Sequence, residues 1–286
     1  MKARPKFFRK TADAAMRCFS GASTVLALTL MAWVLFTIAS EGHGAISAEF
    51  FTNPSKPYGE TGGGIANALL GTLLITLGAT VLALPPALAA GIWLAEFGKD
   101  SRLAKAARFT VNVMMGIPSV IIGLFAYGAL VATTGSFSGF AGSFALAILM
   151  FPVVARTAED QFAGVSDSLR ESALALGAGR ARTTVTVIWK AARSGTLTGI
   201  LLAVARVSGE TAPLLFTALY ADAWPTGYFS SPTPSAPVLI TNCTMDSPFE
   251  AMHRTGWGAA LSMAAILLAV NIAVRHFGSK GTAKRE

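Results

Sequence analysis

Arg206 and Glu210 are the residues of this chain whose types and spacing most directly suggest chemistry. They lie four positions apart in the otherwise apolar stretch LLAVARVSGETAPLLFTALY, so a continuous helix would place both on one face. A charge near the centre of a lipid bilayer costs roughly 2.5 to 3.5 kcal/mol, and such residues therefore face a bundle interior or a polar path. The pair is thus a candidate solute route, with a structural ion pair between helices as the alternative.

The composition supports a membrane setting for this pair. Of the 286 residues, 53% are hydrophobic and 13% are charged, whereas a soluble globular domain carries about 25% charged residues. Because several apolar runs are also too long for the core of a soluble protein, the expected fold is an all-α, polytopic membrane protein.

Six apolar runs approach the ~20 residues that cross about 30 Å of hydrocarbon. They cover residues 18–39, 64–95, 107–131, 136–155, 195–219 and 257–274. Pro85 and Pro86 in the second run, Pro118 in the third and Pro152 in the fourth predict bends. Such bends can open a cavity between helices, or the prolines can be ordinary ones whose lost hydrogen bonds are replaced by neighbours.

The distribution of basic residues predicts the orientation. All of the 23 Lys and Arg residues except Lys56, Arg206 and Arg254 fall in the terminal tails, the second connection, or the fourth connection with the end of the run before it. Because cytoplasmic loops are enriched in Lys and Arg, we expect both termini to be cytoplasmic. The same bias explains the net charge of +8 without nucleic-acid binding. The first apolar run is longer than that of a signal peptide, so we expect it to be retained.

The sequence offers little for catalysis or metal binding. Cys18 and Cys243 are expected on opposite sides of the membrane and so cannot pair within one chain, and no metal-ligand spacing occurs. The sequence contains no H-E-x-x-H or G-x-S-x-G motif, which argues against an intramembrane enzyme. It also lacks a G-x-x-x-x-G-K-[ST] loop, so a partner ATPase would have to energise uphill transport. A self-contained, ion-coupled secondary transporter is the alternative.

The long polar connection 159–193 is expected to form a helical elbow. Ser168 and Glu171 match the S-x-x-E capping box, which predicts a short helix that starts at Ser168. Gly177 would allow the left-handed turn that ends this helix, and residues 183–192 offer a second amphipathic stretch. The apolar positions that would share one face are Leu169, Ala173 and Leu176. Such an elbow can insert into a partner's groove or lie on lipid headgroups.

The elbow sequence resembles the EAA motif of permease subunits in ATP-binding-cassette importers. That motif reads E-A-A, three residues, G, nine residues, I, one residue, L-P. Its first part is matched in spacing by Glu171, Ser172, Ala173 and Gly177. Trp189 and Lys190 stand where Leu-Pro is expected, so the helix-ending proline is absent. By this resemblance, the residues that couple to the ATPase would be Leu169, Glu171, Ser172, Ala173 and Gly177.

Four further strings are similar to the phosphate-specific permeases of the PstA family. They are RVSGETAPLLFTA at 206–218, GIWLAEF at 91–97, FPVVAR at 151–156 and SPFE at 247–250, before the span that begins at Trp257. The resemblance covers residues 64–276 and implies the MetI-like fold of type I importer permeases, with six transmembrane helices. It implies ATP-driven import of inorganic phosphate across a bacterial inner membrane. A permease for sulfate, molybdate or phosphonate shares every physical argument except the string at 206–218.

Arginine chemistry agrees with an anionic substrate. A planar guanidinium offers two parallel donors, so Arg206 suits phosphate better than a lysine would. In a span over 195–219 it lies near mid-membrane, and Glu210 would pair with it until phosphate arrives. Ser208 and Thr211 are further polar groups nearby. The resemblance also matches Arg156 to a second transport-related arginine, although a lone arginine at the end of a span commonly snorkels to the headgroups.

The resemblance implies a multi-subunit assembly. The expected partners are a second, PstC-like permease, two PstB-like ATPase subunits that bind ATP and Mg, and a periplasmic PstS-like phosphate-binding protein. No cofactor is expected in this chain itself. The expected organisation is a tail, first helix and periplasmic loop over 1–63, a permease domain over 64–276 with the coupling loop 159–193, and a basic cytoplasmic tail over 277–286. The outer loop 220–252 would meet the binding protein.

Overall fold

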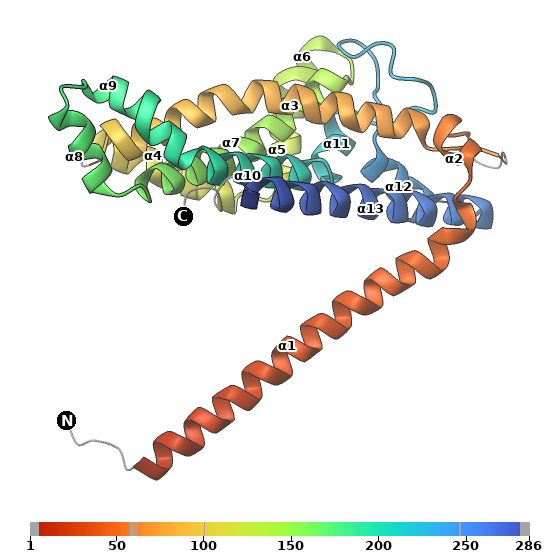
Figure 1. The fold of residues 1–286 in the computed structure, drawn as a ribbon. Helices are drawn as coiled ribbons and strands as arrows, with labels where there is room; N and C mark the ends of the chain where they lie inside the picture. Colours follow the sequence, from red (N-terminus) through yellow and green to blue (C-terminus); the bar gives the residue numbers. More distant parts are fainter. Residues whose placement is uncertain (1–5, 58–59, 61, 100, 246, 281–286) are drawn as a thin grey trace.

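The computed structural model describes residues 6–57, 60, 62–99, 101–245 and 247–280, and the regular structure of these residues is entirely helical (Figure 1). The predicted all-α class is therefore confirmed. The five long helices are α1 (Lys6–Gly42), α3 (Ala66–Ile92), α7 (Gly139–Ala163), α10 (Trp189–Val207) and α13 (Glu250–Lys280). The ends of the two basic tails, with Lys2, Arg4, Lys284 and Arg285, lie outside the described residues.

Length and composition make this a multi-pass membrane protein. Within the described ranges, five helical segments can cross a membrane: Ala12–Ala45, Ala66–Phe97, Gly139–Ala163, Arg180–Val207 and Glu250–Ala273. A bent pair of helices, Arg102–Gly116 and Ser119–Thr134, makes a sixth span if the two count as one. Counted in this way, the spans agree in number with the six predicted from the sequence. The third and the fifth differ in shape from the prediction.

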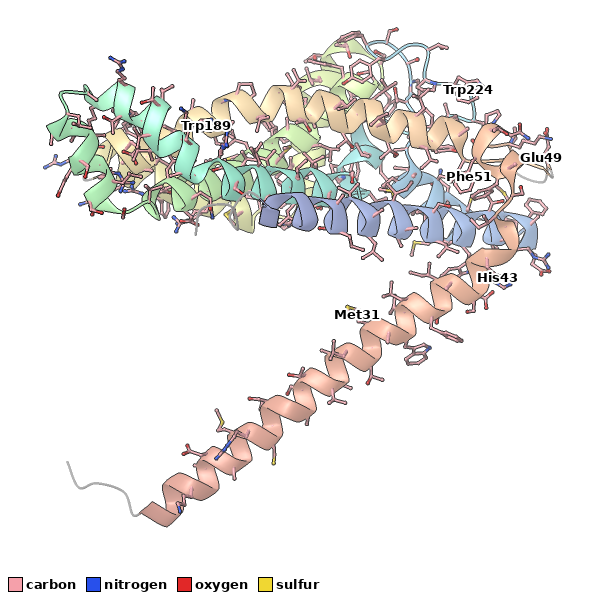
Figure 2. The ribbon with its side chains drawn as sticks, viewed as in Figure 1. Met31, His43, Glu49, Phe51, Trp189 and Trp224 are labelled. Atoms are coloured by element: carbon pink, nitrogen blue, oxygen red, sulfur yellow. The ribbon has the colours of Figure 1, made fainter. Side chains whose placement is uncertain are left out.

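Helix α1 extends away from the rest of the protein (Figure 1). Its side chains from Ala12 to Phe36, with Met31 among them, are exposed (Figure 2). The last residue of α1 is held against α13, since a Cβ on Gly42 would lie 2.6 Å from the carbonyl oxygen of Trp257. A short 3-10 turn (His43–Ala45) and α2 (Ala48–Thr52) then lead toward α3. An apolar helix exposed all round requires lipid or another subunit as its surroundings.

Helices α3 and α7 form the centre of the helical body. The buried cluster they share contains Ile75, Ala79, Ala83 and Ala87 of α3 and Leu146, Met150, Val154 and Ala155 of α7. Small residues allow close approach, since a Cβ on Gly91 would lie 2.4 Å from the carbonyl oxygen of Ala155. Pro85 and Pro86 lie inside α3 and Pro152 inside α7, and both helices continue past them.

The third predicted span is broken at Pro118. Helix α4 (Arg102–Gly116) and α5 (Ser119–Ala126) are joined by Ile117 and Pro118, and the pair is bent by 101°. Proline has no N–H for the helical ladder and disfavours helical backbone in the preceding residue, so Ile117 is extended at φ −73° and ψ 127°. The bend predicted at Pro118 is confirmed, whereas the continuous span over 107–131 is wrong. A π turn (Tyr127–Val131) and α6 (Ala132–Thr134) complete this segment.

The fifth predicted span, 195–219, is wrong at both ends. The helical run begins with α9 (Arg180–Thr183), passes through a π turn at Thr184–Ile188 and ends with α10 at Val207. A turn then leads to the short helix α11 (Ala212–Thr217). Hydropathy does not reveal this break because the apolar residues continue across it. Gly209 and Pro213 are the local signals for it.

The segment after α11, expected to be an outer loop over 220–252, is partly helical. It contains α12 (Ala236–Met245), which packs on α13 and buries Val238, Leu239 and Cys243. Asn67 of α3 holds the start of this segment, because its Nδ2 donates 3.1 Å to the carbonyl oxygen of Asp222. Cys243 and the exposed Cys18 are both free thiols.

Candidate functional site

Two helix breaks meet around one pocket, and Arg206 and Glu210 both line it. The break between α4 and α5 contributes Met114, Met115, Ile117, Pro118 and Ser119. Leu149 and Val153 of α7 complete the lining of a cavity of about 250 Å³. At membrane depth, non-helical backbone is tolerated only where protein buries it or where it lines a water-filled cavity. The meeting of two breaks therefore makes this pocket the candidate functional site.

The pocket lies beside the middle of the helical body. Leu149 and Val153 are near the centre of α7, which runs from Gly139 to Ala163. Arg206 lies in the last turn of α10 rather than in the middle of a continuous span.

The expected i, i+4 arrangement of Arg206 and Glu210 is wrong. After α10 ends at Val207 the chain turns, with the Gly209 N–H donating to the Arg206 carbonyl oxygen over 3.2 Å. Glu210 follows this turn and is not on α10. In the part of the chain that the structure describes, neither side chain forms an ion pair. The two groups instead share the lining of one cavity.

The start of α5 adds a second electropositive element to this pocket. Its N-cap is Pro118, which makes no capping hydrogen bond through its side chain. The first N–H to donate within this helix is that of Ile121, to the Pro118 carbonyl oxygen over 3.0 Å. The amides of Ser119 and Val120 precede it, so they carry the partial positive charge of a helix N-terminus. Together with the Arg206 guanidinium, such amides can hold a small oxyanion. Glu210 would compete with that anion for the guanidinium.

Sequence reasoning missed Ser119 and the start of α5 as parts of the site. Pro118 was the available signal, because a proline that ends one helix can also begin the next. The sequence also gives no signal for the packing of α5 against α11, which brings the two helix breaks together. A Cβ on Gly123 would lie 2.6 Å from Cα of Pro213, so α5 and α11 touch directly at that point.

Arg156 does not line the pocket. It lies on α7 after Val153, where its Nη2 is 3.1 Å from Asp160 Oδ1 and its Nη1 is 3.4 Å from Glu159 Oε2. Glu159 is buried and also accepts a hydrogen bond of 2.5 Å from Arg108 Nε of α4. Arg156 is thus part of an ionic network with Glu159, Asp160 and Arg108.

The elbow begins earlier than the capping box predicted. Helix α8 covers Asp167–Ala175, and its N-cap is Ser166, not Ser168. The Ser168 hydroxyl donates to Ser166 Oγ over 3.3 Å and caps no backbone amide, so the predicted capping box is wrong. Asp167 supplies the acidic group of the first helical turn in its place.

Gly177 ends α8 as predicted. It has φ +82°, in the left-handed region that glycine adopts without strain. The N–H of Ala178 donates to the Ala173 carbonyl oxygen (3.3 Å) and that of Gly177 to the Leu174 carbonyl oxygen (2.9 Å). These two bonds form a Schellman motif, which fixes the direction in which the chain leaves α8.

The elbow exposes both charge and apolar surface. Glu171, Ser172 and Gly177 are exposed, and Leu176 is 88% exposed. Leu169 and the buried Ala173 are four positions apart in α8 and share a face as predicted, whereas Leu176 is the C-cap and lies outside the helix. Leu169, Leu174 and Leu176 are all exposed, and several exposed apolar side chains in one short segment are the kind of surface that a protein partner covers.

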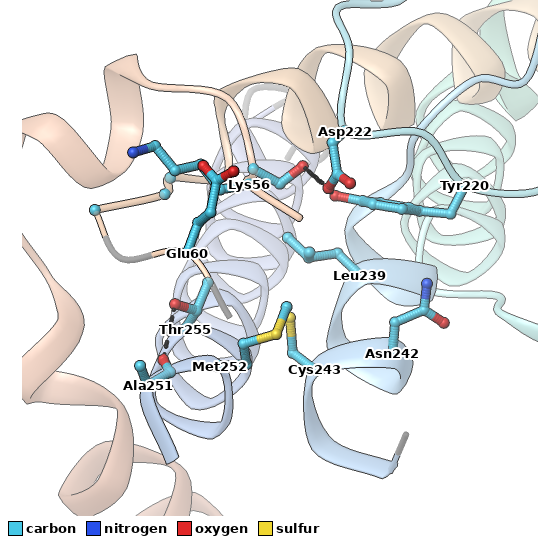
Figure 3. A pocket seen from close by; sticks show the side chains of 14 residues that line it. Lys56, Glu60, Tyr220, Asp222, Leu239, Asn242, Cys243, Ala251, Met252 and Thr255 are labelled. Atoms are coloured by element: carbon cyan, nitrogen blue, oxygen red, sulfur yellow. Dashed lines mark hydrogen bonds between the residues drawn. The ribbon is translucent and has the colours of Figure 1, made fainter. Parts of the chain in front are cut away.

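A second cavity, seen from close by in Figure 3, is lined in part by α12, which lies at the other end of the helical body from α8 and α9 (Figure 1). It has a volume of about 110 Å³, and its lining includes Glu60, Asp222, Asn242, Met252 and Thr255. Tyr220 and Ser55 hold its wall in place, since the Tyr220 hydroxyl donates 2.7 Å to Ser55 Oγ. Burial raises the pKa of Tyr220, so the phenol stays protonated near neutral pH. This cavity lies between the segment just before α3, the segment just after α11, and the helices α12 and α13.

The fold agrees with comparisons against known families and solved structures. Residues 87–280 match the family described as "Binding-protein-dependent transport system inner membrane component". The chain belongs to this family. It is a permease subunit of a transport system and not an enzyme. One solved neighbour, from inward-facing conformations of the MetNI methionine ABC transporter, has a TM-score of 0.60 at 14% identity. It covers 76% of this chain and 94% of its own, and it shows the shared fold alone.

Curated relatives extend over nearly the whole length of the permease. A phosphate transport system permease protein PstA from Haemophilus influenzae is 40% identical and is aligned over 95% of both chains. The protein of the same name from Yersinia pestis is 42% identical, over 91% of this chain and 88% of its own. A probable PstA from Methanocaldococcus jannaschii is 37% identical over 95% of both chains.

We predict that Gly177→Ala loosens the elbow. A side chain at φ +82° costs about 1 kcal/mol, which should raise the rate of tryptic cleavage after Arg180 and Arg182 about fivefold. The measurement is limited proteolysis of the purified permease, followed by mass spectrometry. Gly179→Ala is the matched control, since Gly179 has φ −67° and open space around its Cβ position. Equal cleavage of the two variants would contradict a structural role for the left-handed turn.

Proposed function

We propose that this chain is the permease subunit through which inorganic phosphate crosses a bacterial inner membrane, in an importer driven by ATP. The observation that carries the proposal is the pocket where two helix breaks bring Arg206, Ser119 and the start of α5 together. A dianion gains from both a bidentate guanidinium and free helical amides. The names of the relatives, all phosphate transport permeases, support phosphate as that anion.

Glu210 gives the site a means of release. Its carboxylate lines the same pocket as Arg206, without an ion pair between the two in the described structure. A phosphate bound to the guanidinium would lie close to this negative charge, which weakens binding electrostatically. A transporter needs such moderate affinity, because a tightly held solute does not leave. We therefore assign Arg206 to capture and Glu210 to release.

Arg156 is the next positive charge that phosphate would meet. It follows Val153, a lining residue of the pocket, on the part of α7 that leads to the elbow. Its side chain is 43% exposed, so it remains accessible while paired with Glu159 and Asp160. The pair with the exposed Asp160 is of the surface kind, worth about 0 to 1 kcal/mol, so an anion can exchange with that carboxylate.

The energy for import comes from partners. We propose that the exposed part of the elbow, Leu169, Glu171, Ser172 and Gly177, docks on one of two PstB-like ATPases that bind ATP and Mg, with Ala173 packed beneath it. A related PstC-like permease would complete the pore. A periplasmic PstS-like protein would deliver phosphate at the end that carries the cavity of Figure 3.

The positive-inside rule supports the orientation of this assembly. Arg102, Lys105, Arg180 and Arg182 lie near the elbow end, where Figure 1 shows α4, α8 and α9 together. We place this end in the cytoplasm, with both termini on the same side. The elbow is then on the side where ATP is available.

We predict that Arg206→Ala abolishes ATP-dependent phosphate uptake while the complex still assembles. Removing the guanidinium leaves neutral donors, the α5 amides and the Ser119 hydroxyl, beside the anion, and each charge-assisted hydrogen bond lost is worth about 1.5 to 3 kcal/mol. Uptake of labelled phosphate into cells or vesicles is the measurement. Arg193→Ala, on the same helix and outside the pocket, is the control and should transport normally. Normal uptake by Arg206→Ala would remove Arg206 from the route.

A permease for sulfate, molybdate or phosphonate is the main alternative, because the pocket chemistry suits any small oxyanion. Competition between labelled phosphate and each unlabelled anion separates these possibilities. We expect only unlabelled phosphate to suppress the signal at low excess; equal suppression by sulfate would indicate a broader or different substrate. Flux without any ATPase present would instead indicate a secondary transporter.

A further inference from the structure

Three arginines from three helices converge on the π turn (Trp93–Phe97) that follows α3 and on the residues just after it, at the elbow end. Arg108 comes from α4, Arg170 from α8 and Arg180 from α9. All three donate hydrogen bonds to the segment from Leu94 to Lys99. None of these arginines lines the pocket around Arg206, so that pocket does not explain why they converge.

A π turn explains why this helix end accepts so many donors. At Trp93–Phe97 the ladder lengthens, and the Gly98 N–H donates 2.7 Å to the Trp93 carbonyl oxygen. An α-helical turn would have paired that N–H with Leu94. The Leu94 carbonyl oxygen instead accepts from Arg108 Nη2 at 2.9 Å. The carbonyl end of a helix is electronegative, so guanidinium groups are its favoured partners.

Arg170 links the elbow to the ends of two other helices. Its Nη2 is 2.8 Å from Glu96 Oε1, and the two side chains are only 12% and 6% exposed. The same guanidinium donates to the carbonyl oxygens of Phe162 (2.6 Å) and Val165, at the end of α7. The hydrogen bond with Glu96 raises the pKa of Arg170, which keeps it charged. One side chain of the elbow therefore holds the ends of both α3 and α7.

Stability alone does not account for such a pair. Replacing a buried ion pair by apolar residues of similar volume is often neutral or stabilising, so the ionic version chiefly fixes geometry. Here the ion pair fixes the position of the elbow relative to α3 and α7. These two helices already pack together, with Gly91 of α3 close to Ala155 of α7. The elbow also continues along the chain, through α9, into α10 and Arg206.

We propose that Arg170 and Glu96 are positioning residues that make the elbow move as one body with α3 and α7. Motion that an ATPase imposes on α8 then reaches the pocket from two sides. One route is the chain through α10, and the other is the Arg170 link into α7, which carries Leu149 and Val153. This inference rests on the proposed function, since it concerns how that import is coupled to ATP.

The test is the number of phosphates imported per ATP hydrolysed by the reconstituted complex. The double variant Glu96→Leu/Arg170→Met leaves no buried charge unpaired, so it should assemble and hydrolyse ATP. We expect its ratio to fall about tenfold or more, since loosely positioned elements lose function before they lose structure. Glu96→Gln, which keeps a hydrogen-bond acceptor, should show a smaller loss. Asp167→Asn is the matched control, because it removes the 77% exposed partner of Arg170 and should leave the ratio unchanged.

The outcomes separate the two claims. A wild-type complex without ATP-dependent phosphate flux would overturn the proposed function. A wild-type complex that transports, beside double and Glu96→Gln variants with the wild-type ratio, would overturn the coupling role of the Arg170 link alone. Reduced flux with an equally reduced ATPase rate would also overturn it, because the ratio would be preserved.

Discussion

Ionisable groups inside a membrane protein must find a partner or water, and this constraint arranges the polar part of the permease. Taking a charge out of water costs several kcal/mol, which an isolated side chain in a helical bundle cannot recover. At the elbow end, Glu96 and Glu159 are buried, and each is paired with an arginine from another helix, Arg170 for Glu96 and Arg108 for Glu159. Arg206 and Glu210 follow the same rule differently, because they line a cavity where water or an anion can reach them.

That cavity exists because two spans are interrupted at the same height. Pro118 turns the chain between α4 and α5, and the turn at Ser208 to Glu210 separates α10 from α11. Backbone groups released by a helix break are costly in lipid but useful beside a polar route, where they act as donors and acceptors. The site is therefore built from backbone geometry as much as from side chains. Its position between breaks explains why an otherwise apolar protein can admit an ion.

The features predicted correctly from the sequence are those that depend on residues close together in the chain. The composition predicted an all-α membrane protein, Pro118 predicted a bend, and Gly177 predicted a helix end, because each effect acts within a few residues. The end of α10 at Val207 escaped prediction, since the apolar run continues to Leu219. The buried helix α12 escaped for the opposite reason, because its neighbours are rich in Pro and Ser. The pair Arg170 and Glu96 joins residues far apart in the chain, and only tertiary packing brings them together.

The most direct test of this account asks whether phosphate occupies the pocket beside Arg206. A cysteine at Ser119, in a Cys18→Ser background, reports occupancy through its rate of labelling by a neutral maleimide during ATP turnover. We predict that phosphate slows this labelling in the assembled complex, and that the protection disappears when Arg206→Ala is added. Labelling of Ser119→Cys at the same rate with and without phosphate, in a complex that transports, would contradict the assignment of this pocket to the anion route.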